Sequence, residues 1–439
     1  MAQHPDVRVD LQRMEFTGQA RGKFEGKAVF VWGGLPGETL TARVSKRQRR
    51  SLSCVAGEIH VPSPHRIPPC EDHYLTCSPW QILSEEQELI FKASLVTDLF
   101  AQRFKLELPQ FQVASGQSFA YRNKLEFSFT EGTDGLSLAF FQRESHRRKI
   151  ELDGCLLGSD AINRAARFVR DVLRANQVAA GQLKSLVLRS NQAGHVAAAL
   201  YVTEAIAPVC DRIADNPIIR GMRVFFSNPL SPASIASELL EETGDSVLEE
   251  QVLSRRFRYS DRSFFQVNIP MYEQAILAIR QFVADSELVY DLYAGVGTIG
   301  ICCEGRHTVF IESDEDSARF LRENCERNGV QADIAMMPAE KAFDAIPRDA
   351  CVILDPPRAG IHPRVLKRLM ASPPQRLIYM SCNPQTQGQD LSILQTAYRL
   401  VHFSAFNFFP RTPRVETLAV LDRIADASAS RKEATDGHG

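Results

Sequence analysis

The sequence contains no apolar run that approaches the roughly 18 residues of a membrane-spanning helix. Its N-terminus, Met1 to Asp6, is polar and lacks the apolar segment of a secretory signal. Neither charge sign is in excess: 51 Lys and Arg against 53 Asp and Glu give a net charge of -2. That balance excludes a histone-like polycation but permits a local basic surface for nucleic acid. These absences favour a cytoplasmic protein without membrane contact, whose ten cysteines are thiols, metal ligands or nucleophiles rather than disulfides.

With 439 residues, 44% of them hydrophobic, the chain is long enough for several domains. Residues 1–64 combine short strand patterns with Gly turns and the basic run Lys46-Arg47-Gln48-Arg49-Arg50, which predicts a small RNA-binding barrel of the oligonucleotide-binding type. Residues 65–255 predict an α+β middle domain. Residues 256–424 predict an α/β domain, and the small, polar residues 425–439 predict a disordered tail.

The α/β prediction depends on apolar strands that alternate with helices. The strands are expected at Leu288–Leu292, Thr308–Ile311, Cys351–Leu354 and Leu377–Met380. Continuous apolar strands in this order indicate a parallel sheet that is covered on both faces. Open sheets of this kind bind their ligands at the carboxyl ends of the strands.

A glycine-rich turn follows the first of these strands. Asp291 precedes Gly295, Gly297 and Gly300, and the next strand ends at Glu312, where a carboxylate can accept both hydroxyls of a ribose. The pattern therefore predicts an adenosine-containing cofactor. The glycine letters alone permit a dinucleotide, but an Asp four residues before the first Gly is typical of S-adenosylmethionine-dependent methyltransferases.

Three later segments carry groups suited to catalysis. Asp355-Pro356-Pro357-Arg358 ends one strand in a rigid loop, because proline fixes φ and removes a backbone donor. Cys382 ends the next strand and is a candidate nucleophile. Glu416 begins the last strand and is a candidate general base, and Arg411 and Arg414 before it are candidate phosphate contacts.

Together these groups fit methylation of uracil at C5. C5 becomes nucleophilic once a thiolate has added to C6, and afterwards a base must remove the C5 proton. That chemistry needs one cysteine, one base and one methyl donor, and the target base must leave its stack. Two other readings remain open: cytosine-5 methylation, which shares the thiolate addition, and a non-catalytic RNA-binding protein that retains the fold.

The motifs resemble those of the RNA uracil-5 methyltransferase family, which modifies tRNA and 23S rRNA. The matching segments are Phe264-Phe265-Gln266-Val267-Asn268, Asp291-Leu292-Tyr293, Asp355-Pro356-Pro357-Arg358, Ser381-Cys382-Asn383-Pro384 and Val415-Glu416-Thr417. The resemblance implies a Rossmann-like class I methyltransferase domain preceded by a TRAM barrel, acting on RNA as a monomer. It also implies Cys382 as nucleophile, Glu416 as proton acceptor, and S-adenosylmethionine contacts from Gln266, Tyr293, Glu312 and Asp355 in addition to Gly295 and Gly297.

Many members of that family carry a four-iron cluster on four cysteines. The resemblance implies Cys70, Cys77 and Cys155 as ligands. The third cysteine of the close group is missing, because Ser78-Pro79-Trp80 stands where it is expected. Cys54 or His73 could replace it, and zinc or no metal at all remain open alternatives.

Overall fold

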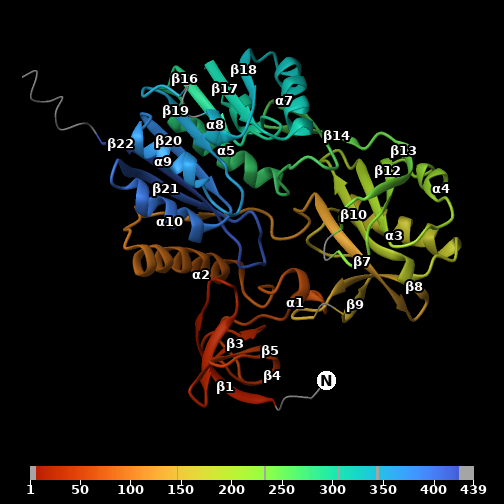
Figure 1. The fold of residues 1–439 in the computed structure, drawn as a ribbon. Helices are drawn as coiled ribbons and strands as arrows, with labels where there is room; N and C mark the ends of the chain where they lie inside the picture. The colour runs from red at the N-terminus through yellow and green to blue at the C-terminus, as the bar shows by residue number, and fades with distance from the viewer. Residues whose placement is uncertain (1–5, 146, 232–233, 304–306, 343–345, 425–439) are drawn as a thin grey trace, which may run out of the picture. The chain divides into compact units, whose positions relative to one another are not determined.

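The computed structural model describes residues 6–145, 147–231, 234–303, 307–342 and 346–424, shown in Figure 1. The chain forms two compact units. Unit 1 contains residues 1–95, 115–271 and 407–414, and unit 2 contains residues 96–114, 272–406 and 415–439. The predicted tail at 425–439 lies outside the described residues. Among the described residues, no helix is long and apolar enough to cross a membrane.

Unit 1 begins with the predicted barrel. Five strands close it in the order β1-β2-β3-β5-β4, with bounds Val7–Met14, Ala20–Phe24, Lys27–Trp32, Thr39–Arg47 and Ser51–Val61 for β1 to β5. Alternating residues of β1 are buried, as expected for strands with one face in a core. The turn Leu35-Pro36-Gly37-Glu38 is fixed from within, because buried Glu38 accepts a hydrogen bond from Leu35 N and pairs with Arg66.

The rest of unit 1 contains the predicted α+β domain. A seven-stranded sheet has the order β13-β12-β11-β10-β7-β8-β9 and packs against α3. Its strands are β7 Lys124–Gly132, β8 Gly135–Phe141, β9 Lys149–Leu152, β10 Leu183–Ser190, β11 Val196–Val202, β12 Ile219–Phe226 and β13 Glu238–Gly244. The other elements are α1 Tyr74–Cys77, α3 Asp160–Ala175, the 3-10 helix η2 Ala180–Gln182, α4 Cys210–Ala214, β14 Val247–Val252 and β15 Arg255–Ser260.

Unit 2 is built on an eight-stranded sheet with the order β18-β17-β16-β19-β20-β22-β21-β6. Its strands are β6 Val113–Ala114, β16 Leu288–Leu292, β17 His307–Glu312, β18 Ala332–Met336, β19 Cys351–Leu354, β20 Arg376–Ser381, β21 Tyr398–Phe406 and β22 Glu416–Arg423. Strands β16 to β20 are parallel, and β22 is antiparallel to both neighbours. The helices are α6 Thr298–Cys302, α7 Glu315–Arg327, α8 Ala339–Ala342, α9 Pro363–Ala371, α10 Pro384–Leu394 and the π-helix η1 Leu99–Phe104.

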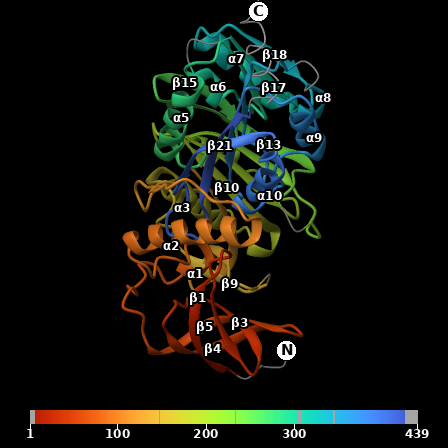
Figure 2. The same ribbon diagram turned by 90° about the vertical axis from the view of Figure 1, so that its left-hand side faces the viewer.

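Two helices carry the chain across the border between the units: α2 (Glu85–Asp98), seen along its length in Figure 2, and α5 (Ile269–Val283). The amino end of α2 is capped by Ser84, whose Oγ accepts a hydrogen bond from Gln87 N. The unit 1 part of α2 packs around a short segment, residues 407–414, that comes from far along the chain.

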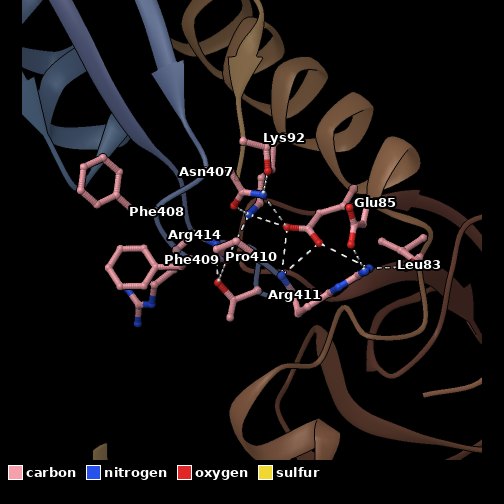
Figure 3. A network of polar contacts seen from close by, with 12 residues as sticks. Leu83, Glu85, Lys92, Asn407, Phe408, Phe409, Pro410, Arg411 and Arg414 are labelled. Atoms are coloured by element: carbon pink, nitrogen blue, oxygen red, sulfur yellow. Dashed lines mark hydrogen bonds and ion pairs between the residues drawn. The ribbon is translucent and has the colours of Figure 1, made fainter. Parts of the chain in front are cut away.

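A buried ion-pair network joins α2 to this segment (Figure 3). Glu88 accepts from Lys92 Nζ at 2.8 Å, from Arg411 N at 3.0 Å and from Asn407 Nδ2 at 3.1 Å. The Arg411 guanidinium donates to Leu83 O and to Glu85 Oε1, both at 2.8 Å. Burial lowers the pKa of Lys92, and the adjacent Glu88 carboxylate opposes that shift.

We expect the substitution Glu88→Gln to lower the free energy of unfolding of unit 1 by about 3–5 kcal/mol, because it leaves buried Lys92 without its carboxylate and removes one of the two carboxylates beside Arg411. Both tryptophans, Trp32 and Trp80, lie in unit 1, so urea unfolding followed by tryptophan fluorescence reports this unit. Exposed Glu86→Gln on the same helix is the control and should change stability by less than about 0.5 kcal/mol. Equal stabilities of the two variants would contradict the expectation.

Candidate active site

The predicted site residues of unit 2 gather along one edge of its sheet. Strands β17, β16, β19 and β20 lie side by side in this order and are parallel, so their carboxyl ends share one edge of the sheet. Glu312 ends β17, and Tyr293, Asp355 and Cys382 each follow the last residue of a strand. Glu416 begins antiparallel β22 beside β20 and therefore lies at the same edge.

The glycine turn after β16 is shaped for close approach of a ligand. Tyr293, Gly295 and Gly297 all have positive φ, at 64°, 57° and 87°. A Cβ at Gly297 would be strained by the positive φ and would lie 2.4 Å from Leu321 Cδ1, whereas a Cβ at Gly295 would meet nothing within 4 Å. The turn thus packs tightly on its inner side and leaves open space at Gly295.

The Glu312 carboxylate is held beside this turn. It accepts hydrogen bonds from the backbone N–H groups of Gly295 at 2.7 Å, Ser313 at 2.6 Å and Asp314 at 2.7 Å. These bonds place a carboxylate next to the open side of the glycine turn. That position suits an acceptor for ribose hydroxyls.

Two carboxyl groups at this edge have a pKa of about 7. Burial raises the pKa of Asp355 to about 7. Burial, with Asp355 and Glu312 nearby, also raises the pKa of Asp291 to about 7, although Asp291 accepts a hydrogen bond from Gly300 N at 3.0 Å. Near neutral pH, Asp355 can therefore donate a hydrogen bond as a carboxylic acid or accept one as a carboxylate.

Cys382 and Glu416 face each other across adjacent strands. Ser381 is paired with Thr417 in the β20–β22 register, so the next residue on β20 lies opposite the preceding residue on β22. Burial, then the negative charges of Glu416 and Asp355, raise the pKa of the Cys382 thiol to about 11. The thiol is therefore protonated near neutral pH, and its use as a nucleophile requires removal of that proton.

A network that the sequence did not reveal fixes the backbone around Cys382. Asn383 Nδ2 donates to Arg358 O at 3.0 Å, and Asn383 Oδ1 accepts from Gln385 N to cap α10. Thr417 Oγ1 donates to Gln387 Oε1 at 2.8 Å on the other side. Asn383 before Pro384 was the available signal, since Asn at an N-cap followed by Pro typically starts a helix.

Three of the residues predicted for cofactor or phosphate binding, Gln266, Arg411 and Arg414, belong to unit 1. Gln266 is buried in a loop whose backbone O accepts from Asn123 Nδ2 at 3.0 Å. Arg411 is 6% exposed, and its N–H groups donate hydrogen bonds to Glu85, Glu88 and the carbonyl of Leu83. The prediction that it contacts a phosphate is therefore wrong. Its φ of 64° and its ion pairs fit a structural role in the 407–414 segment instead.

The three cysteines predicted as metal ligands do not all come together in the structure. Cys77 and Cys155 come together with Glu71 and His73, and the donor atoms of these four lie within 4.8 Å of one another. Cys70 is exposed and is not part of this group among the described residues. A group with two thiols does not fit the four cysteines of the implied four-iron cluster. Of the two residues considered as replacements for the missing cysteine, His73 belongs to this group and Cys54 does not, and Glu71 was not predicted.

The parallel sheet with its glycine-rich turn has the architecture of the Rossmann-like methyltransferase class, and comparison with known proteins identifies an S-adenosylmethionine-dependent RNA methyltransferase. The tRNA (uracil-5-)-methyltransferase family profile matches residues 84–424, and the chain belongs to that family.

Known proteins match this chain over nearly its full length. An uncharacterized RNA methyltransferase of Bacteroides thetaiotaomicron is 26% identical and covers 93% of this chain and 100% of its own. One from Chlorobaculum tepidum is 28% identical and covers 91% and 92%. The Pyrococcus abyssi tRNA (uracil-54, C5)-methyltransferase, solved in complex with S-adenosyl-L-homocysteine, has the same fold, with a TM-score of 0.76 and 24% identity over 94% of this chain and 100% of that one.

Proposed function

We propose that this enzyme methylates C5 of one uridine in a structured RNA, either tRNA or 23S rRNA, through a covalent adduct between Cys382 and C6. The observation that supports this most strongly is the pairing of a thiol and a carboxylate at the sheet edge that carries the cofactor loop. Cys382 and Glu416 approach from neighbouring antiparallel strands, so both can face one base. A cytosine-specific reading has no comparable support from these residues.

In the proposed reaction, Cys382 Sγ releases its proton to solvent and bonds to C6, and the electron pair of the C5–C6 double bond moves into an enolate. Bound S-adenosylmethionine would supply the methyl group that C5 then takes and would leave as S-adenosylhomocysteine. Glu416 accepts the proton from C5, and the returning electron pair breaks the Sγ–C6 bond. The thiolate is thereby regenerated and 5-methyluridine is released.

Several residues would hold the cofactor. Glu312 would accept the ribose hydroxyls, and the open side of Gly295 would admit the ligand next to it. Asp355, with its pKa near 7, would bind a polar group close to the methyl donor. Tyr293, Gly297 and Gln266 complete the proposed set.

The barrel is the proposed RNA-binding module. Its basic run Lys46-Arg47-Gln48-Arg49-Arg50 is exposed at the turn between β4 and β5. Exposed Lys and Arg side chains bind phosphates and position an RNA without reading its sequence. We place the enzyme in the cytoplasm as a monomer, with shape and splayed bases selecting the target.

The proposal is tested by mass-spectrometric nucleoside analysis of tRNA and 23S rRNA, purified separately from cells that lack the gene. We expect 5-methyluridine to disappear from one pool and to return when the wild-type gene, but not the Cys382→Ala gene, is restored. The purified protein should then methylate the deficient RNA. Unchanged 5-methyluridine in both pools, or loss of 5-methylcytidine instead, would refute the proposed target base.

A further inference from the structure

Four potential metal ligands converge in unit 1, and none of them is among the residues assigned to catalysis. Glu71, His73 and Cys77 lie in or next to the short helix α1, and Cys155 lies in the turn after β9. The side chains of His73 and Glu71 are only 11% and 9% exposed, and Cys155 is buried. One carboxylate, one imidazole and two thiols therefore point into one shielded place.

The spacing of these donors fits one ion. All four ligand atoms lie within 4.8 Å of one another, and His73 Nε2 is 3.2 Å from Glu71 Oε1. Bonds of about 2.0–2.3 Å to a tetrahedral ion place neighbouring donors about 3.3–3.8 Å apart. A four-iron cluster instead keeps its thiolates apart by a core of iron and sulfide and asks for four cysteines.

The ion-pair contact of His73 Nε2 is with another of the four donors, Glu71 Oε1, at 3.2 Å. His73 Nε2 is buried and makes no hydrogen bond of acceptable geometry. Buried polar atoms without a partner are rare in native proteins and often mark a missing ion. A metal ion at the centre of the four donors would satisfy this nitrogen.

Neighbouring residues also hydrogen-bond to the potential ligands, as is usual around metal sites. Glu71 Oε2 accepts from Gln81 Nε2 at 2.8 Å, and Glu71 Oε1 accepts from Leu156 N at 2.6 Å. Cys155 N donates to Asn163 Oδ1 at 2.9 Å, and Asn163 Nδ2 returns a bond to Cys155 O. These bonds orient the Glu71 carboxylate and fix the backbone of Cys155 before any ion binds.

We propose that Glu71, His73, Cys77 and Cys155 bind a single zinc ion in place of the iron–sulfur cluster found in related enzymes. Two thiolates with one imidazole and one carboxylate form a closed tetrahedral site of the kind that zinc occupies in structural roles. The ion would cross-link residues 71–77 to the turn at Cys155, which belongs to the core of the seven-stranded sheet. Its role is to stabilise unit 1 rather than to take part in catalysis.

The test is elemental analysis of the purified full-length protein, with the Cys70→Ser variant as control. We expect one zinc per chain, no acid-labile sulfide, and the same zinc content in Cys70→Ser. Replacement of zinc by Co²⁺ should give the intense visible bands of a tetrahedral site with thiolate ligands. Four iron atoms with sulfide, or a chain without stoichiometric metal in which Co²⁺ gives no such bands, would overturn the proposal.

Because loss of a core thiol can prevent folding, milder variants locate the site. Gln81→Ala leaves all four ligands in place and removes the support of Glu71, so we expect zinc affinity to fall by about 10- to 100-fold. His73→Ala should lose the tetrahedral Co²⁺ spectrum. Affinity and spectrum equal to wild type in both variants would place the metal elsewhere and overturn the assignment.

Discussion

Replacing Cys382 with alanine should reduce RNA methylation by at least about 10⁴-fold while leaving RNA affinity within about twofold of wild type. In the proposed reaction, the thiol forms the only covalent bond between the enzyme and its substrate. No other described cysteine follows a strand at the edge of the sheet that carries Glu312 and Asp355. The measurement is transfer of labelled methyl groups to RNA, with affinity measured in parallel by filter binding.

Cys325→Ala is the matched control for this substitution. Burial raises the pKa of Cys325 to about 11, as for Cys382, but this residue lies in helix α7. The control should therefore retain methylation within a few-fold of wild type. Residual activity of Cys382→Ala above about 1% would show that uridine is methylated without a covalent adduct.

Glu416→Gln should stop turnover at a different point. The thiolate can still add and the methyl group can still be transferred, but nothing removes the C5 proton, so the Sγ–C6 bond persists. We expect a protein–RNA complex that survives denaturing electrophoresis and accumulates in proportion to enzyme, while steady-state turnover falls by about 10³-fold or more. Glu416 is 2% exposed, which limits rescue by water.

The double variant Cys382→Ala with Glu416→Gln distinguishes this adduct from tight binding, because it should give no complex that resists denaturation. The mass of the trapped complex should also include one methyl group. Wild-type turnover in Glu416→Gln would show that another group accepts the proton.

The parts of the fold that could be predicted are those that local pattern determines. The strands Leu288–Leu292 and Cys351–Leu354 have the predicted bounds, since continuous apolar runs between turns have few alternatives. Strand β18 was missed because its alternation is weak and much of it is exposed. The clustering of Glu312, Asp355 and Cys382 was predictable, because parallel strands place their ends together.

Long-range pairing limited the rest of the prediction. Nothing near Arg411 in the sequence indicates that its partners are Glu85 and Glu88, and an Arg beside a catalytic strand was an obvious candidate for phosphate. Likewise, the iron–sulfur pattern names the cysteines and His73 as a possible replacement, but it gives no reason to expect Glu71, which only the folded chain brings beside Cys155.

Because the ribosome synthesises a chain from its N-terminus, the late position of segment 407–414 affects how unit 1 folds in the cell. N-terminal domains commonly fold while the rest of a protein is being made. Here Glu88 is synthesised 319 residues before Asn407 and 323 residues before Arg411, and both of these residues donate hydrogen bonds to its carboxylate. Unit 1 therefore cannot be completed until residues 407–414 have left the ribosome, and a nascent chain stalled before residue 407 should remain sensitive to protease around α2.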